Sequence, residues 1–328
     1  MRRTVGAIRA GITGTVPQWR HRPGTYASGM SPLDVDTRVL RYFVAVAERL
    51  SFTAAARDLY VSQPALSRQI RQLEADLGVE LFVRTGREIR LTAAGGELLR
   101  SARTALDDWR DAVRVVRSVA AAEANVLRVG FVVSGGGSVA RRARAAFAEQ
   151  RPDVAVEPKR CDWGAEPDAL RQGVVDVAFV WLPADTAGLR ARVVATEARY
   201  VALARDHPLT ARESVGIADL RDEPLMWTRK APKEWVDWWA VNPRPDGREP
   251  VWGPENDNVD EMLEHVATGA AVCFGPESMA AYYAHPDLAW RPVTDIEPLR
   301  IAIAWVPETV NPVAHAFVAA TLRLSSAT

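Results

Sequence analysis

Hydroxyl, amide and guanidinium side chains gather where a stretch of helical periodicity begins: Ser62, Gln63, Ser67, Arg68 and Arg71. Groups of these kinds hydrogen-bond to base edges and phosphates in the major groove of DNA. A helix N-terminus adds a partial positive charge that favours phosphate. The alternative is a solvated polar face on an ordinary helical domain, so the surrounding elements must decide between the two.

Three short helices are predicted around these side chains. Apolar residues spaced three and four apart predict a first helix over 35–49. Ser51 can cap a second helix over 53–59, and Ser62 and Gly78 delimit a third. Two short helices joined by a tight turn form a helix-turn-helix. One face of the third helix is predicted to be core: Leu66, Ile70, Leu73 and Leu77.

A β-hairpin, or wing, is predicted directly after the third helix. Residues 81–91 contain two short apolar runs on either side of a Thr-Gly turn. Arg84 and Arg87 lie at that turn, where a guanidinium group can reach the DNA backbone or the minor groove. Lone arginines on a turn are usually solvated, so the inference depends on their position beside the helix-turn-helix.

Residues 52–95 resemble the winged helix-turn-helix of LysR-type transcriptional regulators. The resemblance runs without a gap through SQPALSRQI, LE..LG, LF.RTGR and LT.AG. It implies that six residues face the major groove: Ser62, Gln63, Pro64, Ser67, Arg68 and Gln69. It also implies that Arg84 and Arg87 serve the wing. The fold class implied is α + α/β, with an N-terminal winged helix-turn-helix, a long linker helix and a two-lobed α/β effector-binding domain resembling periplasmic solute-binding proteins.

Residues 97–121 are predicted to form one long helix with an apolar seam. The seam residues alternate four and three apart, which is the pattern of two paired helices. They are Leu98, Ala102, Ala105, Trp109, Ala112, Val116 and Val119. The resemblance implies that this segment pairs two subunits, so that a dimer presents two recognition helices to a palindromic site. Gly95 and Gly96 stand where the helix should begin, and either a hinge or a first-turn position would explain them.

Strands and helices alternate after residue 122, which predicts a mostly parallel sheet covered on both faces. The segments 176–179, 204–209 and 266–276 resemble landmarks of the effector-binding domain of the same family. We expect a disordered or wrongly assigned extension over 1–33, a winged helix-turn-helix over 34–92, a linker helix over 93–122 and an effector-binding domain over 123–328. Lobe one is expected at about 125–193 and 295–328, and lobe two at about 194–294.

Candidate effector-binding residues follow the predicted strands, because ligands of open α/β folds bind at the carboxyl ends of strands. They are Ser134, Gly135, Ser138, Trp163, Trp181 and Thr228. Ser134 opens a glycine-rich turn suited to an anion, and Thr228 is expected to face it across the cleft. Nine of the eleven tryptophans lie beyond residue 122, which indicates an aromatic-rich cleft for a flat or apolar ligand. An ordinary turn and core packing remain the alternatives.

Net charge differs between the two ends of the chain although it is zero overall. Residues 1–122 hold 19 arginines and 12 acidic residues, a net charge of +7, whereas residues 123–328 carry −7. A basic front and an acidic back indicate that only the front meets a polyanion. No run of 18 apolar residues occurs, which argues against a transmembrane helix. Two cysteines in 328 residues indicate a reducing compartment.

The first 33 residues contain five arginines and no acidic residue. An arginine and two glycines interrupt the apolar core that a secretory signal needs, and the pair Arg2-Arg3 lacks the core of a twin-arginine signal. A disordered basic arm and a translation start at Met30 are the two interpretations. Neither gives the segment a fixed structure.

The sequence therefore predicts a cytoplasmic, sequence-specific DNA-binding transcriptional regulator rather than an enzyme. We expect a dimer or tetramer on a palindromic promoter site, responding to a small-molecule effector in the C-terminal cleft. No cofactor, metal or membrane partner is expected, and RNA polymerase is a further candidate partner. The five histidines are scattered and no GxSxG motif occurs, so no metal or catalytic constellation is apparent. A solute-binding or transporter subunit and a cleft enzyme are the alternatives.

Overall fold

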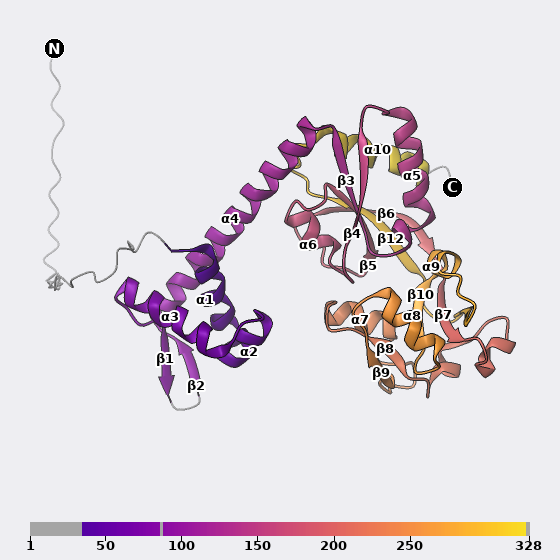
Figure 1. Ribbon diagram of the computed structural model, residues 1–328, viewed down its shortest axis with the longest axis horizontal. Helices are drawn as coiled ribbons and strands as arrows, with labels where there is room; N and C mark the ends of the chain where they lie inside the picture. The colour runs from indigo at the N-terminus through magenta and orange to yellow at the C-terminus, as the bar shows by residue number, and fades with distance from the viewer. Residues whose placement is uncertain (1–34, 86–87, 326–328) are drawn as a thin grey trace, which may run out of the picture. The chain divides into compact units, whose positions relative to one another are not determined.

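The computed structural model describes residues 35–85 and 88–325, and the chain divides into two compact units, 1–104 and 105–328. Each unit is described by itself (Figure 1). The expected extension over 1–33 lies outside the described residues. Within the described part of the chain, no helix combines the length and the apolar character that crossing a bilayer requires.

The N-terminal unit contains three helices, a hairpin and the start of a long helix: α1 (Thr37–Arg49), α2 (Phe52–Asp58), α3 (Gln63–Leu77), β1 (Phe82–Thr85), β2 (Glu88–Leu91) and α4 (Ala93–Glu123). Ser51 caps α2 by accepting from the Ala54 N–H at 3.2 Å, and Ser62 caps α3. Gly78 ends α3 with φ +67°, a left-handed conformation that glycine adopts without strain. The helix-turn-helix and the hairpin predicted from the sequence are confirmed.

A small aromatic core joins the three helices to the hairpin. The Phe82 ring of β1 lies 5.5 Å from that of Phe43 and 5.9 Å from that of Phe52, measured between centroids. Leu66 and Ile70 on α3 are fully buried beside them, as the apolar face of the predicted helix requires. The position of α3 is therefore fixed by packing on its inner face, which leaves its outer face free.

Helix α4 begins at Ala93, four residues before the predicted start. The Thr92 hydroxyl caps it by accepting from the Gly95 N–H at 2.9 Å. A Cβ atom at position 95 would lie 2.2 Å from the Leu81 carbonyl oxygen, so only glycine allows this close approach to the hairpin. The glycine pair therefore lies in the first turn of the helix, one of the two placements that the sequence left open.

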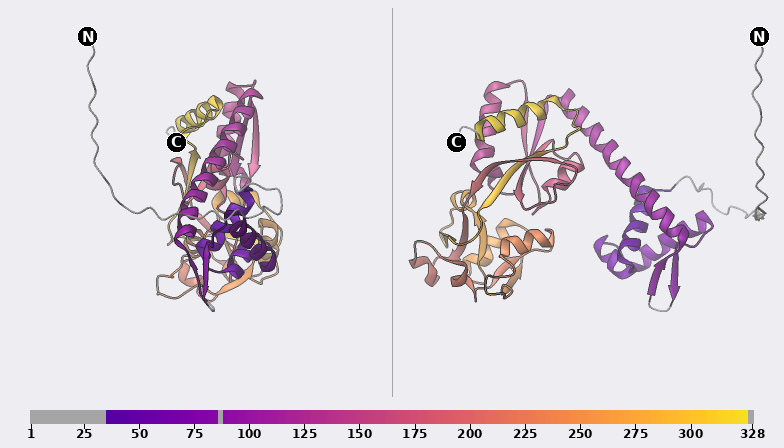
Figure 2. Two further views of the ribbon diagram at one scale, coloured as in Figure 1. Left: turned by 90° about the vertical axis from the view of Figure 1, so that its left-hand side faces the viewer. Right: turned by 180° about the vertical axis from the view of Figure 1, so that it is seen from behind.

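Lobe one of the C-terminal unit is a five-stranded sheet with the strand order β4-β3-β5-β12-β6. Its elements are β3 (Val126–Phe131), α5 (Gly137–Gln150), β4 (Ala155–Arg160), α6 (Glu166–Arg171), β5 (Val177–Leu182), β6 (Arg190–Glu197), β12 (Leu299–Trp305) and α10 (Pro312–Ser325). Val177, Phe179 and Trp181 of β5 pack into one core with α5 and α10. Ala178 and Val180 pack into a second core with α6. Figure 2 shows α5 and α10 beside each other on this lobe.

Lobe two forms the second wall of the cleft that the sequence predicts between the lobes. Its elements are β7 (Arg199–Ala204), β8 (Leu225–Trp227), α7 (Lys233–Ala240), β9 (Trp252–Glu255), α8 (Val259–Ala267), β10 (Cys273–Pro276), α9 (Glu277–Tyr282) and β11 (Leu288–Pro292). Strand β7 is central in the sheet β10-β7-β11, and β8 pairs with β9. The apolar face of α8 includes the buried Met262, Leu263 and Val266 and packs against β7.

One expectation about this unit needs correction, since the sheets are not mostly parallel. The five-stranded sheet is mixed, because β12 runs antiparallel to both of its neighbours whereas β3 is parallel to β4 and β5. The sheet β10-β7-β11 is antiparallel throughout, and β8 and β9 are parallel. Strand β6 pairs along its whole length with β12 and ends at Glu197.

The C-terminal half of α4 packs on lobe one. The Arg117 Nη1 donates to the Gln172 carbonyl at 2.9 Å, and the Ser118 and Thr309 hydroxyl oxygens lie 3.3 Å apart. Gly173 has φ +63°, and a Cβ atom there would lie 2.8 Å from the Arg114 Cα atom. These contacts attach the helix to the turn between α6 and β5 and to the segment between β12 and α10.

Candidate nucleic-acid interface and ligand cavity

The first two turns of α3 present the polar side chains predicted to face the major groove. Five of the six are exposed: Ser62, Gln63, Pro64, Arg68 and Gln69. Ser67 differs, since it is only 4% exposed and its hydroxyl accepts a hydrogen bond from Gln63 Nε2 at 2.8 Å. The arrangement places an amide, a guanidinium group and a second amide outward, with Ser67 beneath the first amide.

The wing is attached to α3, the helix that carries this surface. The Glu74 Oε1 atom accepts hydrogen bonds from the backbone N–H groups of Leu81, at 2.9 Å, and Phe82, at 3.2 Å. These bonds tie the start of β1 to the C-terminal half of α3. Arg84 belongs to β1, and Arg87 lies outside the described residues.

The apolar seam of α4 is divided between two environments. Leu98 and Ala102 pack into the core of the N-terminal unit, and Ala102 is buried. Ala105 and Ala112 are exposed, Trp109 is 58% exposed and Val116 is 68% exposed. Large apolar side chains exposed in a row on one helix favour a partner surface. Because Ala102 already packs in its own unit, the free part of the seam begins at Ala105.

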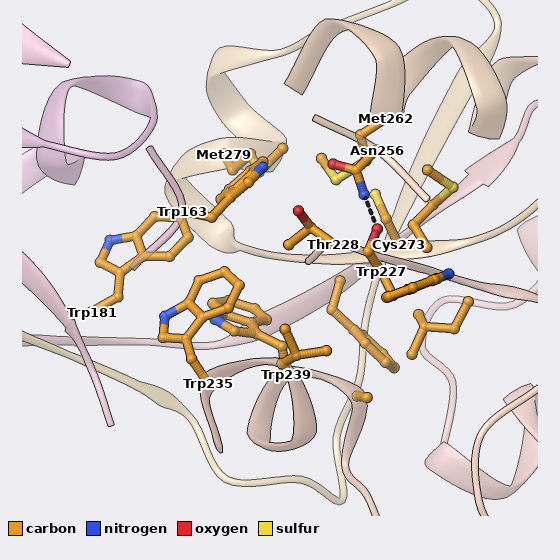
Figure 3. Close-up of a pocket in the computed structure, with 15 residues that line it drawn as sticks. Trp163, Trp181, Trp227, Thr228, Trp235, Trp239, Asn256, Met262, Cys273 and Met279 are labelled. Atoms are coloured by element: carbon orange, nitrogen blue, oxygen red, sulfur yellow. Dashed lines mark hydrogen bonds between the residues drawn. The ribbon is translucent and has the colours of Figure 1, made fainter. Parts of the chain in front are cut away.

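A cavity of about 60 Å³ lies between the two lobes, enough for a few water molecules. Fifteen described residues line it, and Figure 3 draws them: Trp163, Trp181, Leu225, Met226, Trp227, Thr228, Trp235, Val236, Trp239, Ala240, Asn256, Met262, Cys273, Phe274 and Met279. Lobe one supplies only Trp163, after β4, and Trp181, in β5. None of the fifteen side chains carries a charge.

Four tryptophans form one continuous aromatic wall. The ring centroids of Trp163 and Trp235 lie 5.9 Å apart, those of Trp235 and Trp239 5.7 Å, and those of Trp239 and Trp181 5.4 Å. All three pairs are tilted, with interplanar angles of 41–51°. The series of ring contacts therefore connects Trp163 and Trp181 of lobe one through α7 of lobe two.

A few polar atoms of the wall have no partner among the described residues. The indole Nε1 atoms of Trp181 and Trp239 and the Oδ1 atom of Asn256 are buried without a hydrogen bond. The orientation of the Asn256 amide is set by its Nδ2 atom, which donates to the Trp227 carbonyl at 2.8 Å (Figure 3). Thr228 accepts from the Lys230 N–H at 3.1 Å. Buried polar groups of this kind need a ligand or water.

The structure brings Trp163, Trp181 and Thr228 together at the cavity, whereas Ser134 and Ser138 are not among its described lining residues. Gly135 belongs to the short 3-10 turn Ser134–Gly136. The Ser134 hydroxyl is buried and lies 3.4 Å from that of Ser278. The turn at 134–137 is covered by the start of α9, where Glu197 Oε2 accepts from the Ser278 N–H at 2.9 Å.

Sequence reasoning missed the contributions of α7 and of the segment before α8. Trp235 and Trp239 lie one helical turn apart on α7, a spacing that pointed only to an apolar helix face. Asn256 lies two residues before the N-cap of α8 and carried no signal of its own. The excess of tryptophan beyond residue 122 was the one available indication.

Burial shifts the pKa of two ionisable groups outside the cavity wall, Arg199 and Glu166. The guanidinium carbon of Arg199 lies 4.3 Å from the ring centroid of Trp238 and 4.9 Å from that of Trp239. Burial, together with the nearby Arg244, lowers the pKa of Arg199 to about 9, so it stays charged at neutral pH. Burial raises the pKa of Glu166 to about 8, which keeps this carboxyl group largely protonated at neutral pH.

Comparison with known proteins identifies both units. A family model described as "Bacterial regulatory helix-turn-helix protein, lysR family" matches residues 37–96. A second, "LysR substrate binding domain", matches residues 120–325. The chain belongs to the LysR family of transcriptional regulators. It is therefore a DNA-binding regulator with a substrate-binding-type domain, not an enzyme.

Relatives of this LysR-type regulator match along most of its length. The HTH-type transcriptional regulator AlsR of Bacillus subtilis (strain 168) is 30% identical over 87% of this chain and 94% of its own. BenM of Acinetobacter baylyi (strain ATCC 33305 / BD413 / ADP1) is 30% identical over 84% of this chain and 92% of its own. The crystal structure of full-length CbnR complexed with its target DNA has 29% identity and a TM-score of 0.52, and it covers 89% of this chain and 100% of CbnR.

The two cysteines of this LysR-type regulator are buried and free. Burial raises the pKa of the Cys161 thiol to about 11 and that of the Cys273 thiol to about 12. A thiol is nucleophilic only when ionised, so neither group is reactive at neutral pH. Among the described residues, no group of three or more His, Cys, Asp or Glu side chains is placed to hold a metal ion.

Proposed function

We propose that the protein binds a promoter site composed of two palindromic half-sites as a homodimer or homotetramer. In this proposal a small molecule in the tryptophan-lined cavity changes the regulator's action on transcription. The site of action is the cytoplasm, and RNA polymerase is a further proposed partner. The observation that carries the proposal is the exposed polar face of α3, held in place by the buried Leu66 and Ile70 beneath it.

We assign recognition of the base sequence to the exposed face of α3, and positioning of the protein on the DNA to the wing. Gln63 and Gln69 offer amide groups, which pair with adenine edges, and Arg68 offers a guanidinium group, which pairs with guanine or phosphate. Ser62 and Pro64 lie beside them at the helix N-terminus, whose dipole favours phosphate. Arg84 and Arg87 are proposed to contact the backbone or the minor groove next to the major-groove site.

The free part of the α4 seam is proposed to pair two chains. Exposed Trp109 and Val116 lie seven residues apart, which is one heptad, and Ala105 and Ala112 lie between and beside them. A two-fold pairing of this helix would supply two α3 surfaces to the two half-sites. Leu98 and Ala102 act in this proposal by holding the seam to the DNA-binding unit.

The cavity is proposed as the effector site because it lies between lobes and leaves buried polar atoms without partners. A ligand shifts an equilibrium only by its difference in affinity for the two states. The turn between α6 and β5 contacts α4, and β5 carries Trp181, so one segment connects the cavity with the linker helix. Lobe movement that changes this contact is the proposed coupling.

Fluorescence anisotropy with DNA from upstream of the protein's own gene tests the proposal. We expect binding that exceeds binding to unrelated DNA, that weakens steeply as salt rises, and that loses its sequence preference in the Gln63→Ala variant. Equal affinity for both DNAs over the whole salt series, in wild type and variant alike, would contradict a regulatory role at this site.

A further inference from the structure

The turn that joins α2 to α3 holds a large side chain in a backbone conformation that suits glycine. The Tyr60 N–H donates to the Arg57 carbonyl at 3.2 Å. The Val61 N–H donates to the Ala56 carbonyl at 3.0 Å. These two bonds form a Schellman motif, whose left-handed position is usually occupied by glycine and sometimes by asparagine. In this turn the position is occupied by Tyr60, with φ +54°.

The end of α3 shows what the same motif requires by itself. The Gly78 N–H donates to the Ala75 carbonyl at 3.2 Å. The Val79 N–H donates to the Glu74 carbonyl at 3.1 Å, which completes the same pattern of bonds. Glycine fills the left-handed position there without the free-energy cost that a residue with a side chain incurs. The turn by itself therefore does not explain a tyrosine at position 60.

The side chain of Tyr60 adds little to the stability of the fold. It is 94% exposed, more than any other large apolar or aromatic side chain in the described part of the chain. It does not belong to the core around Phe82, and its hydroxyl group bonds to no described residue. Leu50, the other non-glycine residue with a positive φ in the described part of this unit, is only 47% exposed. An unfavourable backbone conformation combined with a fully available side chain indicates a role in binding.

The surroundings of the turn favour an anion. Tyr60 precedes the Ser62 N-cap by two residues, so it adjoins the end of α3 that is proposed to read bases. In helix-turn-helix proteins that end contacts base edges while the preceding helix crosses the DNA backbone. Asp58 of α2 is paired with Arg49 at 2.6 Å, and the exposed Arg57 adds positive charge beside the turn.

We propose that the Tyr60 hydroxyl donates a hydrogen bond to a phosphate oxygen at the edge of the major groove that α3 enters. The inference rests on the proposed placement of α3 in that groove and adds a contact to it. A phenolic O–H is an uncharged donor, and tyrosine is among the side chains that contact phosphate in protein–DNA complexes. The ring loses little conformational entropy when it is held, because it has only two side-chain torsions. Tyr60 therefore positions the helix and does not read bases.

Fluorescence anisotropy of the full-length protein tests the hydroxyl group. Two duplexes are compared over a salt series: DNA from upstream of the protein's own gene and an unrelated sequence. Tyr60→Phe should weaken binding to both by at least about fivefold, because a hydrogen bond to a charged group is lost. The slope of log affinity against log salt should stay unchanged, because no charge is removed. Tyr282→Phe, at an exposed tyrosine of α9 in the C-terminal unit, is the control and should change neither quantity.

A second variant separates DNA contact from folding. Tyr60→Gly removes the hydroxyl group together with the unfavourable backbone conformation. It should bind both duplexes at least as weakly as Tyr60→Phe, while the urea concentration at its unfolding midpoint equals or exceeds that of the wild type. A lower midpoint would mean that the side chain supports the fold, and it would overturn the argument for a binding role.

Duplexes that each carry a single methylphosphonate locate the phosphate. The modification replaces one charged phosphate oxygen with a methyl group. At one phosphate of each half-site it should weaken wild-type binding about fivefold more than it weakens binding of Tyr60→Phe, because the two changes remove the same bond.

The outcomes separate this inference from the proposed function. Tyr60→Phe binding as tightly as the wild type, or no phosphate that distinguishes the two proteins, would overturn the phosphate contact. A loss on the gene's upstream DNA alone would mean that Tyr60 contacts a base, which also overturns it. Equal wild-type affinity for both duplexes would contradict the proposed function, and the loss expected for Tyr60→Phe on either duplex would still decide the inference.

Discussion

The α3 surface and the tryptophan cavity differ in how they are built. The residues of the α3 surface lie within two helical turns, are mostly exposed, and include the charged Arg68. The cavity draws residues from positions 163 to 279, is largely buried, and its fifteen described lining residues carry no charge. The first suits a polyanion whose position is read through polar contacts. The second suits a small molecule selected by shape and by a few hydrogen bonds.

The second difference is whether one chain forms the complete site. The cavity has walls from both lobes of the C-terminal unit, and we expect it to bind a ligand without a second chain. The α3 surface is proposed to be half of a site, which a second chain completes through the exposed seam of α4. Assembly, stability and DNA readout should therefore respond to different substitutions.

The largest effect is expected from breaking the seam. The double variant Trp109→Glu, Val116→Glu places two carboxylates on the exposed apolar face and should prevent pairing. Without a second α3 the operator affinity should fall about 100-fold or more, because the avidity of two linked half-sites is lost. Analytical ultracentrifugation and anisotropy measure the two effects.

Ligand binding should survive the same double variant. Asp108→Glu, on the outer face of α4, is the control and should change neither assembly nor operator affinity. If the seam variant remained a dimer, or if its cavity lost a ligand that the wild type binds, the separation between a complete cavity and an incomplete DNA surface would be wrong.

The second effect concerns the buried acid near the cavity. Burial raises the pKa of Glu166 to about 8 in the folded chain, against 4.5 for a solvated glutamate side chain, so the folded state holds an extra proton between these values. The unfolded state binds fewer protons there, so the free energy of unfolding falls as the pH rises through this window. Relative to Glu166→Gln, the wild type should lose about 3 kcal/mol between pH 4 and pH 7. Urea unfolding at several pH values measures this difference.

A flat difference between wild type and Glu166→Gln over that pH range would mean that the carboxyl group is ionised inside the fold. The lining of the cavity would then border a negative charge, and the contrast between a charged surface and an uncharged cavity would be weaker. Glu157→Gln is the control, because it removes a carboxylate from a half-exposed position of β4 in the same lobe.

DNA readout should separate within the N-terminal unit. Gln63→Ala should reduce discrimination between operator sequences by about 1–3 kcal/mol at one base pair, because an amide pair to a base edge is lost. Arg84→Ala should instead weaken binding to all sequences and lower the salt dependence by about one counterion. Anisotropy over a salt series with mutated operators distinguishes them, and identical behaviour would refute the division of roles.

The N-terminal unit was largely predictable because its signals are local. Ser51, Ser62 and Gly78 act as caps within one turn of the residues they cap, and the spacing of Leu66, Ile70 and Leu73 defines the buried face. The start of α4 was less predictable. Gly95 is explained by the approach of the Leu81 carbonyl, a contact between elements that sequence spacing does not report.

The sequence predicted which kind of residue lines the cavity, but not most of the individual residues. Tryptophan enrichment indicated an aromatic cleft, and Trp163, Trp181 and Thr228 do line it. The site's other half depends on how α7 and the segment before α8 fold over β8, which is a matter of long-range topology. Ser134 had the right chemistry for a ligand turn, but the start of α9 covers it, a contact 144 residues away in sequence.

A smaller effect is expected where α4 meets lobe one. Gly173→Ala should destabilise the fold by about 1–2 kcal/mol through its left-handed backbone alone, and further through the approach to Arg114. Gly188→Ala is the matched control, since Gly188 has φ +72° and no neighbouring atom within 4 Å. Hydrogen exchange of α4 that increased equally in both variants would mean that the close approach at Gly173 contributes nothing to attachment of the helix.

The smallest effect is expected from Ser67, and it tests how the α3 surface is organised. Because Ser67 is buried and accepts from Gln63 Nε2, we expect it to orient that amide rather than to touch DNA. Ser67→Ala should then cost about 0.5–1.5 kcal/mol of base discrimination. In a Gln63→Ala background the same substitution should have no further effect, which a double-mutant cycle measures. Additive losses would instead mean that Ser67 contacts the DNA directly, as the sequence resemblance implied, and that the recognition helix becomes more exposed at this position when it binds.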